Sequence, residues 1–222
     1  MHRRVVASSA YRQSTEFDPN AALKDPENRL LWRFHRLRMD VEALRDSLLA
    51  ISEQLDETPG GTLLPTANRA YVTSTENKNP AIYGSHRRSI YLPVVRSSLF
   101  QLFTAFDFAD PSTLAGQRDQ TTVAPQALFM MNSEFVLEQS RIIAQRLLQR
   151  TDLDQPARLR HLYRLAYSRD PSEGEVSRAA GYLDRIRDAM AQAGVAESDL
   201  DLRSWTSLSR AVLSANEFIY VE

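Results

Sequence analysis

The sequence contains no cysteine, and this absence alone excludes several kinds of chemistry. Disulfides, thiolate nucleophiles, zinc sites with cysteine ligands and covalently attached haem all require that side chain. The four histidines, His2, His35, His86 and His161, show no spacing that would pair two of them on a metal. We therefore expect no metal site and no cofactor held by this chain.

Long apolar runs are also missing. No window approaches the roughly 20 apolar residues of a membrane-spanning helix, so no membrane span is expected. The first residues are basic and turn polar at Ser8, and we expect no signal peptide among them. Lys and Arg total 27 against 28 for Asp and Glu, so the net charge of -1 gives no overall attraction to nucleic acid, and none is expected as a partner. The localisation stays open.

Catalytic motifs are absent as well. The sequence has no Gly-rich phosphate loop, nucleophile elbow or zincin motif, so no catalytic residue is assigned and the balance is against an enzyme. The chain is nevertheless expected to fold, because 43% hydrophobic and 25% charged residues are ordinary for a globular protein.

The first strong pattern predicts a long helix over 25–57. Asp25 and Pro26 fit a helix start, and apolar residues then recur alternately four and three positions apart from Leu30 to Leu55. Arg38 and Glu42 stand at the i,i+4 spacing of a surface ion pair on this helix. The apolar seam favours packing inside a monomer, with a helical dimer as the alternative.

A loop-rich segment is predicted over 58–97, with a short strand near 89–92, where β-forming residues precede Pro93. The region 98–150 is predicted to hold a short helix over 98–106, a turn, and a second long helix from about residue 121. The region 154–216 is predicted to form three helices. Asp154 caps the first, and Ser172 with Glu175 makes a capping box for the second.

These elements predict a mostly α fold: a bundle of about five to six helices with an irregular polar central segment. We expect an N-terminal segment over 1–24 and a single helical domain over 25–222.

The densest polar side chains outside the predicted helices supply the candidate ligand-binding residues. They are Arg87, Arg88, Tyr91, Arg96, Asp107, Asp110 and Arg118, joined by Gln126 and Asn132 from the second long helix. In one interpretation the Arg and Asp side chains pair and fix the irregular segment onto the helices. In the other they form a site for an anion or a sugar, with the arginines as donors and Asp107 or Asp110 as acceptors or acid/base groups.

Four segments together resemble a known family. They read RSIYLPVVR at 88–96, FDFADP at 106–111, TTVAPQALFMMNS at 121–133 and SANEFIYV at 214–221. These segments resemble the planctomycete-specific domain called PSD one, also known as domain of unknown function 1553. The resemblance extends from Tyr11 to the C-terminus.

The resemblance implies relatives and neighbours but no catalytic residues, because the family has no established activity. Family members usually carry this domain at the C-terminal end of larger exported proteins, behind a signal peptide, cytochrome c-like segments that bind haem and often a lectin-like sandwich. Those parts are not in this sequence, so we expect an excised piece or a stand-alone remnant of such a protein. Cytochrome c-like and lectin-like domains are the partners that the resemblance suggests.

Two hypotheses follow. The first is an uncharacterised helical accessory or interaction module of a cell-envelope multidomain protein. The second is a site that binds or hydrolyses anionic polysaccharide in the Arg/Asp-rich central segment. A single concave pocket around Arg87, Arg88, Arg118, Asp107 and Asp110 would favour the second hypothesis, and internal pairing of these side chains would favour the first.

Overall fold

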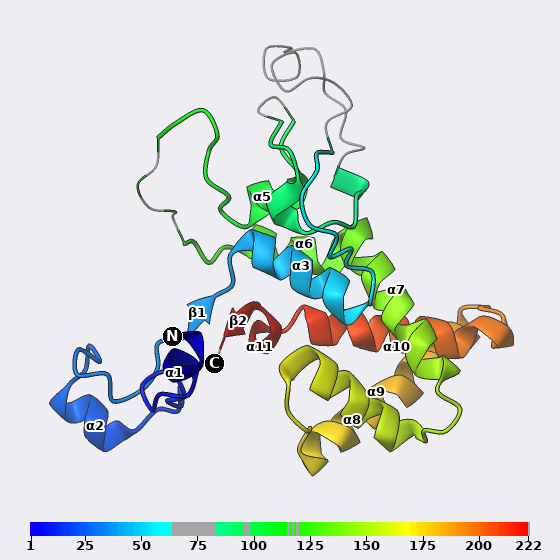
Figure 1. Cartoon of the computed structure of the whole chain (residues 1–222). Helices are drawn as coiled ribbons and strands as arrows, with labels where there is room; N and C mark the ends of the chain where they lie inside the picture. Colours follow the sequence, from blue (N-terminus) through cyan, green and yellow to red (C-terminus); the bar gives the residue numbers. More distant parts are fainter. Residues whose placement is uncertain (64–82, 96–97, 115, 117, 119, 222) are drawn as a thin grey trace.

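The computed structural model describes residues 1–63, 83–95, 98–114, 116, 118 and 120–221 (Figure 1). This part of the chain is mostly helical, as predicted. Its longer helices are α3 (Val41–Ile51), α6 (Ala124–Asn132), α7 (Glu134–Gln149), α8 (Gln155–Tyr167), α9 (Glu173–Gln192) and α10 (Glu197–Leu213). Its shorter ones are α1 (His2–Val6), α2 (Pro19–Lys24), α5 (Gln101–Ala105), α11 (Asn216–Ile219) and the 3-10 turn η2 (Ser89–Tyr91). None of these helices is long and apolar enough to cross a membrane.

The C-terminal helices form much of the core, where α10 packs against both α7 and α9. Trp205 and Leu213 of α10 are buried in the same cluster as Leu147 of α7. The start of α9 agrees with the prediction from the sequence. Ser172 Oγ accepts a hydrogen bond from the Glu175 N–H at 3.3 Å, and the Glu175 carboxylate accepts one from the Ser172 N–H at 2.7 Å, so the predicted capping box is present.

The predicted long helix over 25–57 is wrong outside 41–51. Asp25 does not begin a helix, because its carboxylate accepts hydrogen bonds from the backbone N–H groups of Arg29 (3.0 Å) and Leu30 (2.7 Å) and holds a turn. Asn28, within this turn, has a left-handed φ of 54°. Leu30 is 85% exposed, so the first part of the apolar seam packs against no core. The helical dimer given above as the alternative would therefore have no continuous helix over 25–57 to form it.

Two short strands join the entry of α3 to the C-terminal end of the chain. β1 (Leu37–Arg38) pairs antiparallel with β2 (Tyr220–Val221), with Leu37 opposite Val221. The strand predicted near 89–92 is not one of them. Ser89–Tyr91 form a 3-10 turn, because the Asp46 carboxylate binds both the N–H (2.8 Å) and the hydroxyl (2.7 Å) of Ser89.

The second long helix is interrupted. Ser133 has an extended backbone, with ψ 132°, and separates α6 from α7. The apolar spacing that runs through this point does not mark one buried face. Leu128 and Met131 of α6 are more than half exposed, whereas Val136 and Ile143 of α7 are buried. The short helix predicted over 98–106 is present as α5.

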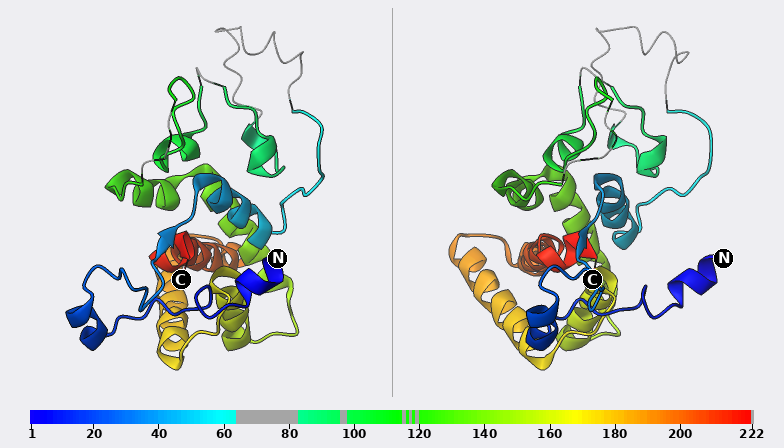
Figure 2. Two further views of the ribbon diagram at one scale, coloured as in Figure 1. Left: turned by 60° about the vertical axis from the view of Figure 1, so that its left-hand side comes forward. Right: turned by 90° about the vertical axis from the view of Figure 1, so that its left-hand side faces the viewer.

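Residues 1–36 form an arm that extends away from the helical body, on the side where β1 and β2 meet (Figure 1). In the left view of Figure 2 α2 lies at the outer edge of the molecule, and in the right view α1 projects outward on the other side. The described parts of the irregular central segment lie at another end of the molecule, above α3 and α6 in Figure 1. The division between an N-terminal segment over 1–24 and one domain over 25–222 stays a prediction.

Candidate functional site

Helix α3 carries the side chains around which the central segment is arranged. Arg45 lies on its buried face, one position after Leu44, and is completely buried. Its guanidinium donates to the carbonyl oxygens of Ser85 and Arg87 (2.9 Å to Arg87) and to Ser89 Oγ (3.2 Å). Burial lowers the pKa of Arg45 to about 10 against the opposing effect of Asp46, so Arg45 remains charged at neutral pH.

A second group of polar contacts joins β1, just before α3, to the turn after α5. Arg38 Nη2 donates to Asp107 Oδ2 at 2.8 Å and Arg38 Nη1 donates to the Thr121 carbonyl oxygen. Asp107 also accepts from the Thr121 N–H (2.8 Å) and hydroxyl (2.9 Å). Burial raises the pKa of Asp107, but the hydrogen bonds from Thr121 and Arg38 outweigh it and hold the pKa below its usual value. Gln126 belongs to the same group of contacts, because its Nε2 donates to the Thr121 carbonyl oxygen at 3.1 Å.

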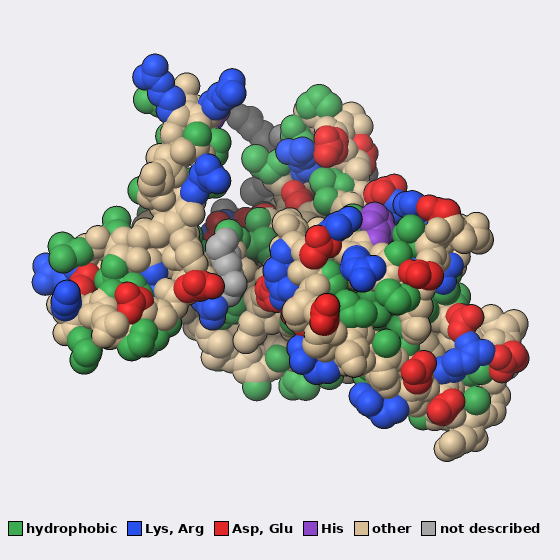
Figure 3. Space-filling model, turned by 90° about the horizontal axis from the view of Figure 1, so that it is seen from below, with side chains coloured by type: hydrophobic (Ala, Val, Ile, Leu, Met, Phe, Trp, Pro, Cys, Tyr) green, Lys and Arg blue, Asp and Glu red, His purple; other side chains and the backbone are tan. Residues whose placement is uncertain are grey.

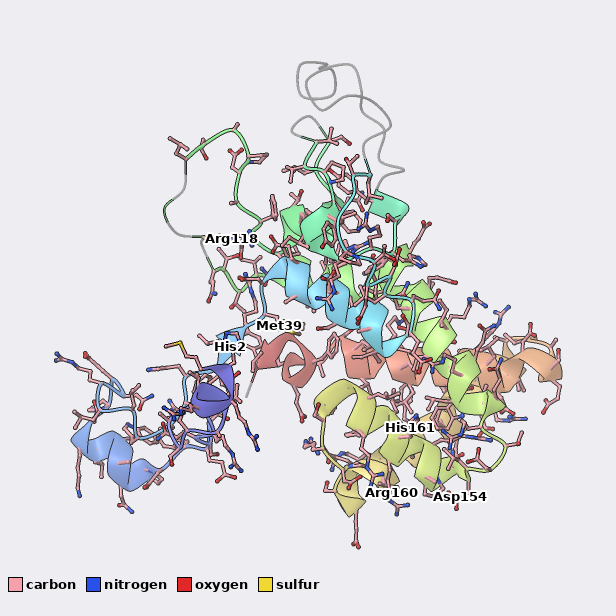
Figure 4. All side chains as sticks on the ribbon, in the orientation of Figure 1. His2, Met39, Arg118, Asp154, Arg160 and His161 are labelled. Atoms are coloured by element: carbon pink, nitrogen blue, oxygen red, sulfur yellow. The ribbon has the colours of Figure 1, made fainter. Side chains whose placement is uncertain are left out.

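The third arrangement is an apolar groove with an ion pair at its rim. The groove has a volume of about 440 Å³ and is lined by Asp40, Glu42, Ala43, Ser89, Ile90, Leu92, Val94, Phe103, Phe108 and Arg118. Arg118, near the start of α3 in Figure 4, forms a two-pronged pair with Glu42, both bonds measuring 2.7 Å. Its guanidinium also lies 5.1 Å from the centre of the Phe108 ring. The hydrogen bonds that Arg118 donates to the Glu42 carboxylate raise the pKa of Arg118.

The remaining arginine candidates bind loops. Arg87 donates to the carbonyl oxygens of Thr58 (2.7 Å) and Gly60, and its guanidinium stacks on the Tyr91 ring at 4.5 Å. Arg88 is about half exposed and lies 3.6 Å from the exposed Glu57. An exposed pair at that distance contributes little to stability.

Three candidates lie apart from these groups or outside the described residues. Asp110 accepts hydrogen bonds from the N–H (2.8 Å) and hydroxyl (2.6 Å) of Ser112 and closes its own turn. Asn132 is exposed at the end of α6, whereas Gln126, the other candidate from this helix, is buried and bonds Thr121. Arg96 lies outside the described residues.

The candidates therefore form several small groups around α3 rather than one pocket. Asp107 and Gln126 share one group of hydrogen bonds, Arg87 and Tyr91 lie in another, and Arg118 pairs with Glu42. The predicted pairing of Arg38 with Glu42 is wrong, because each has a partner from a distant segment. No group of three or more His, Asp or Glu side chains that could hold a metal ion occurs in the described part of the chain.

Sequence reasoning missed Arg45, the most deeply buried charge of the site. A signal for it was available, since the buried residues of α3, Val41, Leu44, Leu48 and Leu49, have the spacing of one helix face and Arg45 lies on that face. A charged residue there needs internal partners, because its burial alone is costly.

Comparison with protein families agrees with the motifs. The family described as "Protein of unknown function (DUF1553)" matches residues 1–183 of the 222. The chain belongs to the DUF1553 family. No curated protein and no solved structure matches it. The match covers all three groups of polar contacts around α3, so these contacts lie within the DUF1553 region, whereas α10 lies beyond it.

Proposed function

We propose that this DUF1553 chain is a helical accessory or interaction module of a cell-envelope multidomain protein, and that its polar central segment has a structural role. The observation that carries the proposal is the internal pairing of that segment. Arg118 is paired with Glu42, Asp107 with Arg38 and Thr121, and the Arg87 guanidinium with loop carbonyl oxygens. Side chains held in this way stabilise an irregular segment, and a ligand would have to displace these bonds.

The cell-envelope setting and the neighbouring domains come from the resemblance to exported relatives. The alternative, a site that binds or hydrolyses anionic polysaccharide in the same segment, has less support. Its donors Arg87 and Arg118 would have to exchange short internal hydrogen bonds for bonds to a ligand. A glycosidase also needs two carboxyl groups that face one bond of the sugar chain. Asp107 is instead held by Arg38 and Thr121, and Asp110 by Ser112.

A double-mutant cycle on Glu42 and Arg118 tests the structural role. We expect Glu42→Gln, Arg118→Met and the double variant to show a coupling free energy of about 0.5–1 kcal/mol in urea unfolding, because both side chains are partly exposed. Each variant is then titrated with sulfated and uronic oligosaccharides while the thermal midpoint is recorded.

The proposal predicts that the oligosaccharides leave the midpoint unchanged, and that a cytochrome c-like or lectin-like domain from an exported relative raises it. If instead an oligosaccharide raises the midpoint of the unaltered chain and Arg118→Met abolishes the rise, the polysaccharide site replaces the structural role. If the neighbouring domains also leave the midpoint unchanged, the interaction role is wrong.

A further inference from the structure

The arm, residues 1–36, is organised by its own hydrogen bonds. Beside the two bonds to the Asp25 carboxylate, the Trp32 indole N–H donates to the Asp25 carbonyl oxygen at 2.8 Å, and Asn28 Nδ2 donates to the Arg33 carbonyl oxygen at 2.7 Å. The Arg33 guanidinium lies 4.9 Å from the Trp32 ring centre, and Trp32 meets Phe17 edge to face. All of these contacts of the turn at 25–33 join residues of the arm to one another.

Large apolar side chains of the arm face outward. Leu30 is 85% exposed, Leu23 82%, Phe17 62% and Leu31 56%. Single exposed leucines are normal on protein surfaces, but four large apolar residues within one short projecting segment indicate a binding surface. Viewed from below, the arm carries hydrophobic, basic and acidic side chains on its surface, at the left of Figure 3.

Leu31 also has a backbone conformation that its side chain disfavours. Its φ is 54°, in the left-handed region where glycine or asparagine is favoured. At Asn28, which has the same φ, the side chain makes hydrogen bonds that account for the residue type. At Leu31 the backbone N–H donates to the Asn28 carbonyl oxygen at 3.2 Å and the carbonyl oxygen accepts from Gln13 Nε2, but the exposed leucine side chain contributes nothing to holding this conformation. Strained residues of this kind are concentrated at functional sites.

The charge of the arm is opposite in sign to that of the rest of the chain. Residues 1–36 contain seven Lys and Arg against four Asp and Glu, a net charge of +3. The other residues contain 20 against 24, a net charge of -4. Lys24 follows Leu23 directly and Arg29 precedes Leu30, so basic groups flank the exposed leucines.

We propose that the arm binds the surface of an anionic lipid membrane. Leu23, Leu30 and Leu31 enter the boundary between headgroups and acyl chains, while Lys24 and Arg29 contact lipid phosphates. Apolar insertion combined with basic residues is the physical basis of peripheral membrane binding. The projecting position of the arm suits a flat surface, because the body does not cover its outer end (Figure 1). The proposal does not depend on the role of the central segment.

Vesicle sedimentation with the whole chain tests this proposal. Vesicles of phosphatidylcholine alone are compared with vesicles that contain an equal part of phosphatidylglycerol. We expect binding to the anionic vesicles only, weakening as salt is added. The double variant Leu30→Ser/Leu31→Ser should bind at least about tenfold more weakly. Leu114→Ser is the matched control, since Leu114 is fully exposed outside the arm and its substitution should leave binding unchanged.

The variant Leu31→Gly separates folding from binding. Because glycine adopts the left-handed conformation readily, the thermal midpoint should stay unchanged or rise while vesicle binding weakens. The proposal is overturned if the unaltered chain does not bind anionic vesicles, or if the leucine substitutions leave binding unchanged. It is also overturned if sedimentation equilibrium without lipid shows a dimer that Leu30→Ser/Leu31→Ser dissociates, because the arm then serves a second copy of the chain.

Discussion

Replacing Arg45 by methionine is the sharpest test of how the central segment is held. Methionine keeps much of the apolar bulk but removes the donors to Ser85, Arg87 and Ser89. Hydrogen bonds to a charged group contribute about 1.5–3 kcal/mol each, while removing a buried charge returns part of its desolvation cost. We expect a net loss of about 3 kcal/mol, because the buried carbonyl oxygens of Ser85 and Arg87 stay behind without this donor. At roughly 2–4 °C per kcal/mol, the thermal midpoint falls by about 6–12 °C.

Urea unfolding followed by circular dichroism measures this loss for Arg45→Met and for a control, Arg203→Met. Arg203 lies 3.8 Å from Asp199, and both side chains are more than half exposed, so the control should change by less than about 0.5 kcal/mol. Replacement of a buried ion pair by apolar groups is neutral in some proteins. If Arg45→Met is as stable as the control, the guanidinium bonds do not hold the segment and the reasoning fails.

Three further predictions concern the helices. Leu44→Ala should cost about 2–5 kcal/mol in urea unfolding, whereas Leu30→Ser should cost less than about 0.5 kcal/mol, and equal losses would mean that Leu30 is buried after all. Ser172→Ala should cost about 1 kcal/mol by loss of the cap, and an unchanged thermal midpoint would contradict the capping box. The hydrogen bond from Arg169 lowers the pKa of Glu175 from 4.5 to about 2, so the unfolded chain binds the proton more tightly. The stability from this pair is complete above about pH 4.5 and is lost as the pH falls toward 2, so Glu175→Gln should flatten the acid unfolding curve, and an unchanged slope would refute the pairing.

Local signals predicted the C-terminal half of the fold well. The capping box at Ser172 and Glu175 and the cap at Asp154 act within three or four residues, so their chemistry can be read directly from the sequence. The same type of signal failed at Asp25. An aspartate before a proline can begin a helix or close a turn, and here the side chain of Asn28 supports the turn. An apolar spacing of three and four residues does not distinguish the two outcomes.

The candidate site was predicted in part, because its residue types were found but not their partners. The ion pair expected between Arg38 and Glu42 requires only helical spacing. The structure pairs Arg38 with Asp107, 69 positions away, and Glu42 with Arg118, 76 positions away. Partners so distant are selected by the packing of whole segments, and no local pattern encodes that choice.

Helix α3 explains why the polar central segment depends on the helical core. One face of this helix places Leu44 and Leu48 in the core, and its last turn is tied to α7 by a 2.6 Å hydrogen bond from the buried Ser52 hydroxyl to Gln139. The same helix presents Arg45 to the residues around Ser89.

Folding therefore accounts for most of the candidate charges of the central segment, since most of their donors and acceptors are paired internally, although the buried Nε atoms of Arg38, Arg45 and Arg87 have no hydrogen-bond partner among the described residues. It does not account for the arm, where apolar side chains stay exposed and Leu31 keeps an unfavourable backbone conformation. Exposed apolar side chains and strained backbone are both common at binding sites. The arm is therefore the part of this DUF1553 protein in which a binding activity should be sought first.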